Sequence, residues 1–266
     1  MVTRAPWIPD EIDFSTFPSS DGQPMADDEV NLEQMIRLIL ELKQPLEPQG
    51  HHVGGNLLVY YDPTDGRRHL APDVFAALDA GPAFRHSWKT WVEGKFPEVV
   101  FEVASPSTQS RDIGEKVRLY AELGAREYYI FDPAGRLDPA FRGYRMRMGR
   151  PSRLPNPTGL SIASPLLGLE LRVVEGWLRV IDPGSGTPYP LPDEALAQAR
   201  EAQARAAVAE EQAARAEEQA AREAAARMSA EEQAKLAGAR AAEAEAALRA
   251  AHAEVARLRA QQRDQK

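Results

Sequence analysis

The sequence predicts an α/β (α+β) fold in which a mixed central sheet is flanked by helices and followed by a long C-terminal helix. Two observations carry this prediction. Residues 29–190 alternate between segments with the 3.6-residue apolar period of a helix and apolar segments of strand length. Residues 191–266 differ in composition: from Asp193 onward there is no proline, no tryptophan, tyrosine or phenylalanine, and alanine is the commonest residue. Such a composition is typical of a continuous helix.

The expected elements begin after an irregular, proline-broken N-terminal arm, residues 1–28. Asp27 and Asp28 cap a first helix, whose period is carried by Leu32, Met35, Ile36, Ile39 and Leu42. A second helix over residues 112–123 opens on an Asp112–Glu115 capping box and stops at Gly124. Strands are expected over residues 56–62, 70–78, 99–105, 127–132, 141–148, 169–174 and 177–181.

Composition and charge exclude several classes of protein. The formal net charge of −8 argues against a protein that coats nucleic acid non-specifically, although it is compatible with a local acidic metal site and a local basic groove. The absence of cysteine excludes disulfides, thiolate zinc sites and cysteine nucleophiles. No apolar run reaches the ~18 residues of a membrane span. The first residues also lack the order of a secretory signal, so we expect a cytoplasmic protein without a membrane partner.

Glu102 is the single ionisable residue in the strand expected over residues 99–105. Because side chains alternate along a strand, Glu102 shares a face with Val100 and Ala104, and the opposite face is equally apolar. A buried carboxylate is costly unless it is paired, protonated or bound to a cation. Glu102 is therefore either a strand-end residue that reaches solvent, or a metal ligand or general base.

Lys116 lies on the helix that follows this strand. At about 100° per residue it falls inside the apolar arc of the helix, between Ile113 and Tyr120. A lysine in such a position either extends its ammonium group to solvent or meets a carboxylate. The preceding strand carries Glu102, which favours a site formed by Lys116 and Glu102.

Asp73 completes the set of candidate residues. It follows Pro72, which suits an edge, a bulge or the start of a strand. An aspartate, a glutamate on a later strand and a lysine are the groups of a magnesium-dependent phosphodiesterase. Two carboxylates hold a cation that polarises the phosphate and lowers the pKa of a bound water, while the lysine orients that water or neutralises developing charge. We therefore expect Asp73, Glu102 and Lys116 to be catalytic, with Asp73 and Glu102 as metal ligands.

The segments APDVFAAL and FPEVVFEVASPSTQSRDIGEKVRLYAELGAREYYIFDP resemble the Uma-type family of endonucleases, within the restriction-endonuclease-like PD-(D/E)XK superfamily. The resemblance is closest over residues 50–135 and extends from residue 30 to about 185. It implies a restriction-endonuclease-like domain over residues 29–190, a Mg²⁺ (or Mn²⁺) cofactor and DNA as the substrate. The family's Pro-Asp corresponds to Pro72 and Asp73, and its acidic strand residue to Glu102.

One position departs from the superfamily pattern. Ala104 stands two residues after Glu102, where the standard motif has a lysine. In the Uma-type family the lysine comes from the helix, which corresponds here to Lys116. Two further residues are candidate accessory groups: Glu33, on the flank of the first helix's apolar stripe, and Tyr120, beside Lys116 in the apolar arc.

Two functions remain open from the sequence, with an unrelated metal-binding scaffold as a weaker third. The first is a Mg²⁺-dependent endonuclease that hydrolyses phosphodiester bonds of DNA. The second is a catalytically silent, nuclease-derived binding or assembly module that acts through its tail. Residues 193–266 are either an alanine-rich coiled coil, which forms a homo-oligomer or binds a protein partner, or a lone solvated helix. The arginines of the strand over residues 141–148 form either a solvated face or contacts to phosphates.

Overall fold

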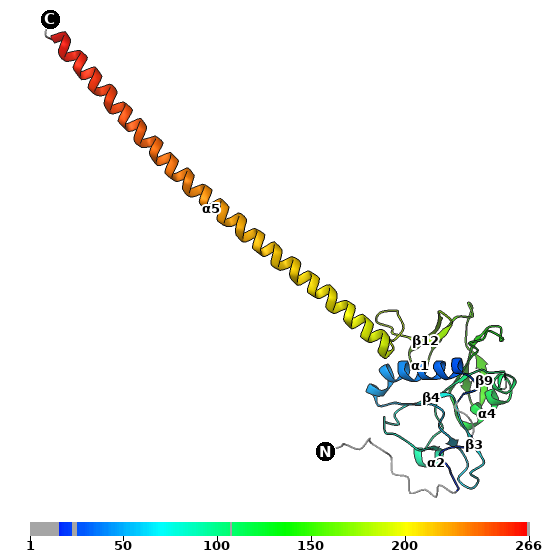
Figure 1. Cartoon of the computed structure of the whole chain (residues 1–266). Helices are drawn as coiled ribbons and strands as arrows, with labels where there is room; N and C mark the ends of the chain where they lie inside the picture. The colour runs from blue at the N-terminus through cyan, green and yellow to red at the C-terminus, as the bar shows by residue number, and fades with distance from the viewer. Residues whose placement is uncertain (1–15, 23–25, 107, 265–266) are drawn as a thin grey trace, which may run out of the picture. The chain divides into compact units, whose positions relative to one another are not determined.

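The computed structural model describes residues 16–22, 26–106 and 108–264. The chain divides into two compact units, Met1–Ala195 and Leu196–Lys266. The first unit combines mixed sheets with short and long helices, and the second is helical (Figure 1). The predicted α+β class is thus confirmed. Part of the predicted N-terminal arm, residues 1–15 and 23–25, lies outside the described residues.

A six-stranded mixed sheet is the centre of the first unit. Its strand order is β1-β4-β6-β7-β8-β9, and every neighbouring pair is antiparallel except β6 and β7, which are parallel. Both central strands are completely buried because they carry apolar residues on both faces. The six strands are β1 (His52–Gly54), β4 (Val74–Ala77), β6 (Val99–Val103), β7 (Glu127–Phe131), β8 (Phe141–Arg147) and β9 (Arg150–Arg153).

One face of this sheet packs against helix α1 (Glu29–Leu46) and a small antiparallel sheet. Asp28 caps α1 as predicted, because its carboxylate accepts a hydrogen bond from the backbone N–H of Asn31 at 2.8 Å. The small sheet has the order β10-β11-β12 and lies beside α1 (Figure 1). Its strands are β10 (Ser161–Ser164), β11 (Leu169–Val174) and β12 (Trp177–Ile181).

The opposite face packs against helix α4 (Glu115–Leu123). The predicted end of this helix is confirmed, since Gly124 adopts the left-handed conformation with φ 107°. The predicted start is wrong. Residues Gln109–Asp112 form a separate short helix, α3, and the N-cap of α4 is Gly114, without a side-chain cap. The Asp112–Glu115 capping box therefore does not form.

The strands predicted over 56–62 and 70–78 are shorter in the structure. Of the first, only β2 (Val59–Tyr60) forms, and it joins a separate three-stranded sheet with β3 (His69–Leu70) and β5 (Trp88–Lys89). The second is divided between β3 and β4, because Pro72 cannot donate to a strand ladder. Two single-turn helices, η1 (Glu47–Gln49) and α2 (Thr90–Glu93), complete the unit.

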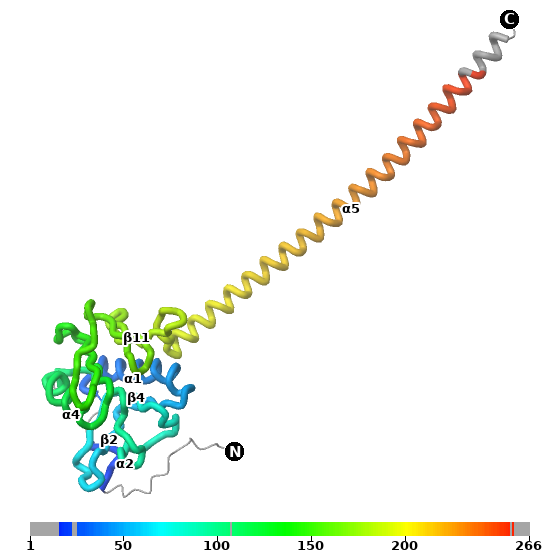
Figure 2. The backbone as a smooth tube through the Cα atoms, turned by 180° about the vertical axis from the view of Figure 1, so that it is seen from behind, coloured from blue at the N-terminus to red at the C-terminus, as the bar shows by residue number. Residues whose placement is uncertain are grey.

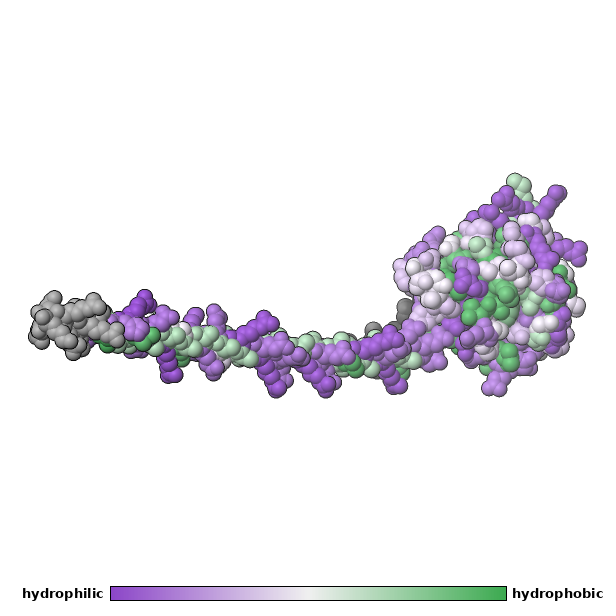
Figure 3. All heavy atoms as spheres, turned by 90° about the horizontal axis from the view of Figure 1, so that it is seen from above, coloured by the Kyte–Doolittle hydropathy of each residue, from purple (hydrophilic) through white to green (hydrophobic). Residues whose placement is uncertain are grey.

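The long helix α5 (Pro192–Asp264) runs without interruption, as Figure 2 shows. Each side chain from Leu196 to Val255 is exposed, and hydrophilic groups follow much of its length (Figure 3). Ion pairs with i,i+4 spacing form along α5, with Glu211 2.5 Å from Arg215 and Glu245 3.3 Å from Arg249. No helix among the described residues is both long and apolar enough to cross a membrane.

Candidate active site

Glu102 is placed by β6, a central strand with a buried residue at every position. Its side chain is 3% exposed, and both carboxylate oxygens have partners on α4. The hydroxyl of Tyr120 donates a hydrogen bond to Oε1 at 2.6 Å, and the ammonium nitrogen of Lys116 lies 3.0 Å from Oε2. Of the two readings of Glu102, the structure excludes the one in which this side chain reaches solvent.

Asp73 immediately precedes β4. The antiparallel register pairs Val74 with Phe101, so the next position brings Asp73 opposite Glu102. The Oδ2 atom of Asp73 accepts a hydrogen bond from the backbone N–H of Val103 at 2.7 Å. The two carboxylates therefore meet at one end of the central sheet, on the face that α4 covers.

Residues 55–56 pack against the backbone of Asp73 and hold it in place. The N–H of Asn56 donates to the carbonyl oxygens of Pro72 and Asp73, at 3.0 and 3.2 Å. At Gly55, a Cβ atom would lie 2.6 Å from the carbonyl oxygen of Asp73 and 2.6 Å from Ile39 on α1. Glycine at this position permits a close approach that any side chain would prevent.

Lys116 bridges two carboxylates. Its ammonium nitrogen lies 2.8 Å from Oδ1 of Asp112 in addition to its contact with Glu102. Asp112 is fully buried, and its other oxygen, Oδ2, accepts no hydrogen bond from the described residues. The capping-box pattern at Asp112 does not predict this contact. The i,i+4 spacing between Asp112 and Lys116 was the signal that could have revealed it.

The electrostatics of the cluster follow from burial. Burial raises the pKa of Glu102, an effect that the Lys116 ammonium opposes. The pKa of Asp73 is raised well above its usual value, first by burial and then by the negative charge of Glu102. Burial alone would lower the pKa of Lys116, but the carboxylates of Glu102 and Asp112 outweigh burial and raise it. Lys116 is therefore protonated at neutral pH, while the two facing carboxylates repel each other.

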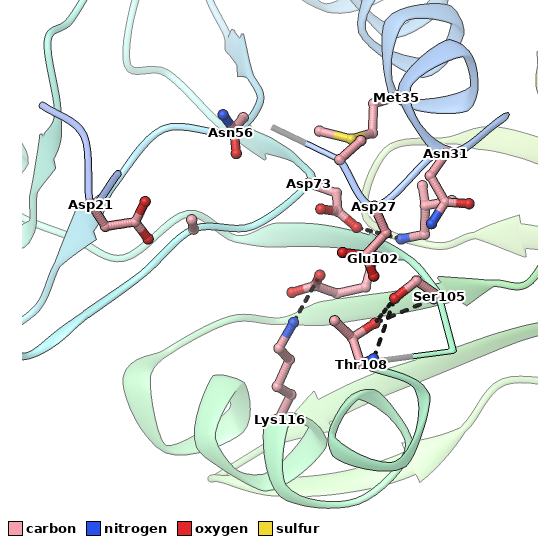
Figure 4. A pocket seen from close by; sticks show the side chains of 13 residues that line it. Asp21, Asp27, Asn31, Met35, Asn56, Asp73, Glu102, Ser105, Thr108 and Lys116 are labelled. Carbon is pink, nitrogen blue, oxygen red and sulfur yellow. Dashed lines mark hydrogen bonds and ion pairs between the residues drawn. The ribbon is translucent and has the colours of Figure 1, made fainter. Parts of the chain in front are cut away.

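A hollow of about 160 Å³ opens over these residues (Figure 4). Asp73, Glu102 and Lys116 converge in it, as the sequence analysis expected of their positions. Lys116 is the single cationic residue among the described residues that line it, and the aspartates Asp21 and Asp27 contribute further negative charge. The remaining lining residues are Ala26, Asn31, Met35, Asn56, Ala71, Val103, Ser105 and Thr108.

The two accessory candidates have different positions. Tyr120 is fully buried and binds Glu102 directly. Glu33 does not line the hollow: it pairs with Arg37 at 2.7 Å, on the surface of α1. At the position of the standard lysine, Ala104 is 1% exposed and packs in the core under α4. The ammonium group reaches Glu102 from α4 instead.

The chemistry of the donor set fits a magnesium ion. Among the described residues no group of three or more histidine or acidic side chains is arranged to hold a metal. Mg²⁺, however, is commonly bound through one or two carboxylates, with waters and substrate phosphate completing its coordination. Asp73 and Glu102 supply two such carboxylates. Burial and then the charge of Glu102 raise the pKa of Asp73, and a divalent cation held by these residues would offset the repulsion between the two carboxylates.

Comparisons with known proteins identify a matching family and a similar solved structure. Among solved structures, the chain is similar to the crystal structure of a putative nuclease belonging to DUF820 from Anabaena variabilis, with 13% sequence identity and a TM-score of 0.41. That similarity covers 56% of this chain and 82% of the other. No curated protein matches the chain. The family model Uma2, described as "Putative restriction endonuclease", matches residues 20–174, more than half of the chain, and the protein therefore belongs to the Uma2 family.

Proposed function

We propose that the protein is a metal-dependent endonuclease that hydrolyses phosphodiester bonds of DNA at the hollow formed by Asp73, Glu102 and Lys116. The observation that carries the proposal is the convergence of two facing carboxylates and one partly buried ammonium group at the end of the central sheet. The family to which the chain belongs supports this choice of reaction.

Asp73 and Glu102 would hold Mg²⁺ or Mn²⁺. When bound, the ion supplies polarisation of the phosphate and a lower pKa for a coordinated water. Hydrolysis adds the oxygen of water to phosphorus and breaks the bond between phosphorus and the leaving oxygen, which takes up a proton. The protein's own groups bind and orient the phosphate for this exchange.

Lys116 acts through its positive charge. Because the pKa of Lys116 is raised, its ammonium group is protonated at neutral pH and cannot serve as a general base. It can donate hydrogen bonds to a phosphate oxygen or to water, and it stabilises the negative charge that develops on the phosphate. Asp112 holds the ammonium group in place from the other side, and Tyr120 fixes the Glu102 carboxylate.

Cleavage of supercoiled plasmid DNA tests the proposal. We expect nicked or linear product in the presence of Mg²⁺ or Mn²⁺ and none in EDTA. Glu102→Ala, which removes a proposed ligand, should abolish cleavage in a matched preparation. Absence of metal-dependent cleavage by the wild-type protein, on DNA of several sequences and in single-stranded form, would contradict the proposal.

One observation favours the second candidate, a silent binding or assembly module. Both oxygens of Glu102 already have partners within the chain, Tyr120 and Lys116, so the site is neutralised in part without a metal. Titration calorimetry with Mg²⁺ and Mn²⁺ separates the two functions. Metal binding that is lost in Glu102→Ala favours the endonuclease, and an absence of binding in the wild-type protein favours the module.

A further inference from the structure

The β8–β9 hairpin carries a concentrated positive charge. Residues 141–153 contain five arginines and no acidic residue, in a chain whose net charge is −8. Arg142 has a structural role, because its guanidinium donates to the carbonyl oxygens of Asp138 and Pro139. The other four, defined here as the hairpin arginines, form no ion pair with any residue that the structure describes: Arg145, Arg147, Arg150 and Arg153.

The arrangement of these arginines costs stability within the fold. A tight turn at Met148 and Gly149, with φ values of 50° and 72°, brings Arg147 directly opposite Arg150. Like charges in directly opposed positions of a strand pair are destabilising. Opposed like charges without an acidic neighbour to neutralise them are expected where a surface serves a function. Met148, at the tip between the two arginines, is fully exposed.

Protection of a sheet edge accounts for only part of this charge. β9 is the outer strand of the six-stranded sheet, and charged residues on an edge strand discourage pairing between molecules. That explanation covers Arg150 and Arg153. It does not cover Arg145 and Arg147, which belong to β8, an interior strand of the sheet.

The arginines of β8 border a second hollow. Arg145 and Arg147 line it together with Arg126, and its volume is about 180 Å³. The carboxylate of Glu127 also lines this hollow, but it is 1% exposed and accepts hydrogen bonds from Tyr129, Ser164 and the backbone N–H of Leu166. Glu127 therefore does not neutralise the three arginines that line the hollow, and these arginines are available to bind a partner outside the described chain.

We propose that the β8–β9 hairpin binds the sugar–phosphate backbone of a nucleic acid, with the hairpin arginines and Arg126 as phosphate contacts. The choice of nucleic acid rests on the proposed function. Guanidinium groups match phosphate oxygens through paired hydrogen bonds. β8 pairs with β7 as far as Arg145, so beyond that residue the hairpin is a two-stranded ribbon, which has the dimensions that enter the major groove of a duplex.

The hairpin lies away from the proposed catalytic hollow. Arg145 pairs with Glu127 at the start of β7, whereas Glu102 is near the end of the parallel strand β6. The hairpin therefore holds substrate at a distance from the scissile phosphate. Its loss should weaken binding more than the chemical step.

Fluorescence anisotropy with a labelled DNA duplex of about 20 base pairs, without divalent cations, tests the proposal. The test variant is Arg147→Gln/Arg150→Gln. The matched control is Arg67→Gln/Arg68→Gln, which removes the same charge from two exposed arginines that pair with Asp65 and Asp62. In the test variant, we expect affinity to fall on the order of tenfold. The slope of the logarithm of the association constant against the logarithm of the salt concentration should become shallower by about 1.8, since each lost phosphate contact contributes about 0.9.

The control should bind as the wild-type protein does, and the melting temperature of the test variant should be unchanged or raised. Equal affinity and salt slope in test and control variants would overturn the proposal, as would displacement of DNA by poly-L-glutamate at equal charge concentration. Binding that depends on the hairpin in a protein that never cleaves would support this proposal while contradicting the proposed function.

Discussion

Lys116 owes its position to carboxylates on two sides of its ammonium group, Glu102 on β6 and Asp112 on α3. The contact with Glu102 could be predicted because a helical wheel left a cation in an apolar arc and the preceding strand carried a buried acid. Asp112 could not be assigned in the same way. A helical wheel assumes one uninterrupted helix. The chain breaks the helix at Gly114, so Asp112 belongs to α3 and not to the first turn of α4.

We expect Lys116→Met to affect both stability and cleavage. The substitution leaves two buried carboxylates without their cation, which should lower the free energy of unfolding of the metal-free protein by about 3–5 kcal/mol. Cleavage should fall on the order of 10²-fold, because a charge near the phosphate is lost. Denaturant unfolding and plasmid cleavage measure the two effects. Lys116→Arg, which keeps the charge, is the control, and full cleavage by Lys116→Met would remove Lys116 from the site.

Metal binding should depend on pH through the raised pKa of Asp73. A group with a raised pKa holds its proton at a higher pH than usual, and a metal ligand must release that proton. Affinity for Mg²⁺ should therefore rise with pH above the ordinary carboxyl range, and proton release on binding should diminish as pH increases. Calorimetry in two buffers of different ionisation enthalpy measures the release. An Asp73→Asn protein with unchanged release would exclude Asp73 as a ligand.

At the scale of elements, the strands that carry the site could be predicted from the sequence, whereas several other strands of the sheets could not. The run of apolar residues in 99–103 identified β6 because a strand buried on both faces has few alternatives. The short strands β1 and β10 and the edge strand β9 escaped prediction. Each depends on a neighbour in the sheet rather than on its own apolar pattern.

A substitution at Gly55 tests whether close packing against the backbone of Asp73 positions this proposed metal ligand. In Gly55→Ala the added Cβ would approach the backbone of Asp73 within 2.6 Å, so that the backbone must shift. We expect weaker Mg²⁺ binding, by calorimetry, with the cooperative unfolding transition retained. Gly184→Ala is the matched control, because its Cβ would meet only ordinary contacts at 3.4 Å or more. Equal metal affinity in both variants would show that this backbone contact does not position Asp73.

At the scale of the whole molecule, composition alone separated the helix α5 from the α+β unit. Alanine offers little apolar area to bury, and side chains from Leu196 to Val255 are exposed. The change in composition at residues 191–193 agrees with the start of α5 at Pro192, and a polar contact holds the first turn of the helix. Glu194, in the first turn of α5, pairs with Arg179 of β12 at 2.8 Å and accepts a hydrogen bond from the backbone N–H of Leu191.

Two truncations should therefore behave differently. A chain that ends at Arg205 keeps Glu194 within a helical turn, and its first unit should unfold cooperatively with the melting temperature of the full chain. A chain that ends at Pro192 loses the partner of Arg179, whose remaining ion pair is with the fully buried Glu41. Because Glu194 is partly exposed, this loss should cost no more than about 1 kcal/mol, a small but measurable drop in melting temperature. If the chain ending at Arg205 lost its cooperative transition, residues beyond 205 would be required for the fold.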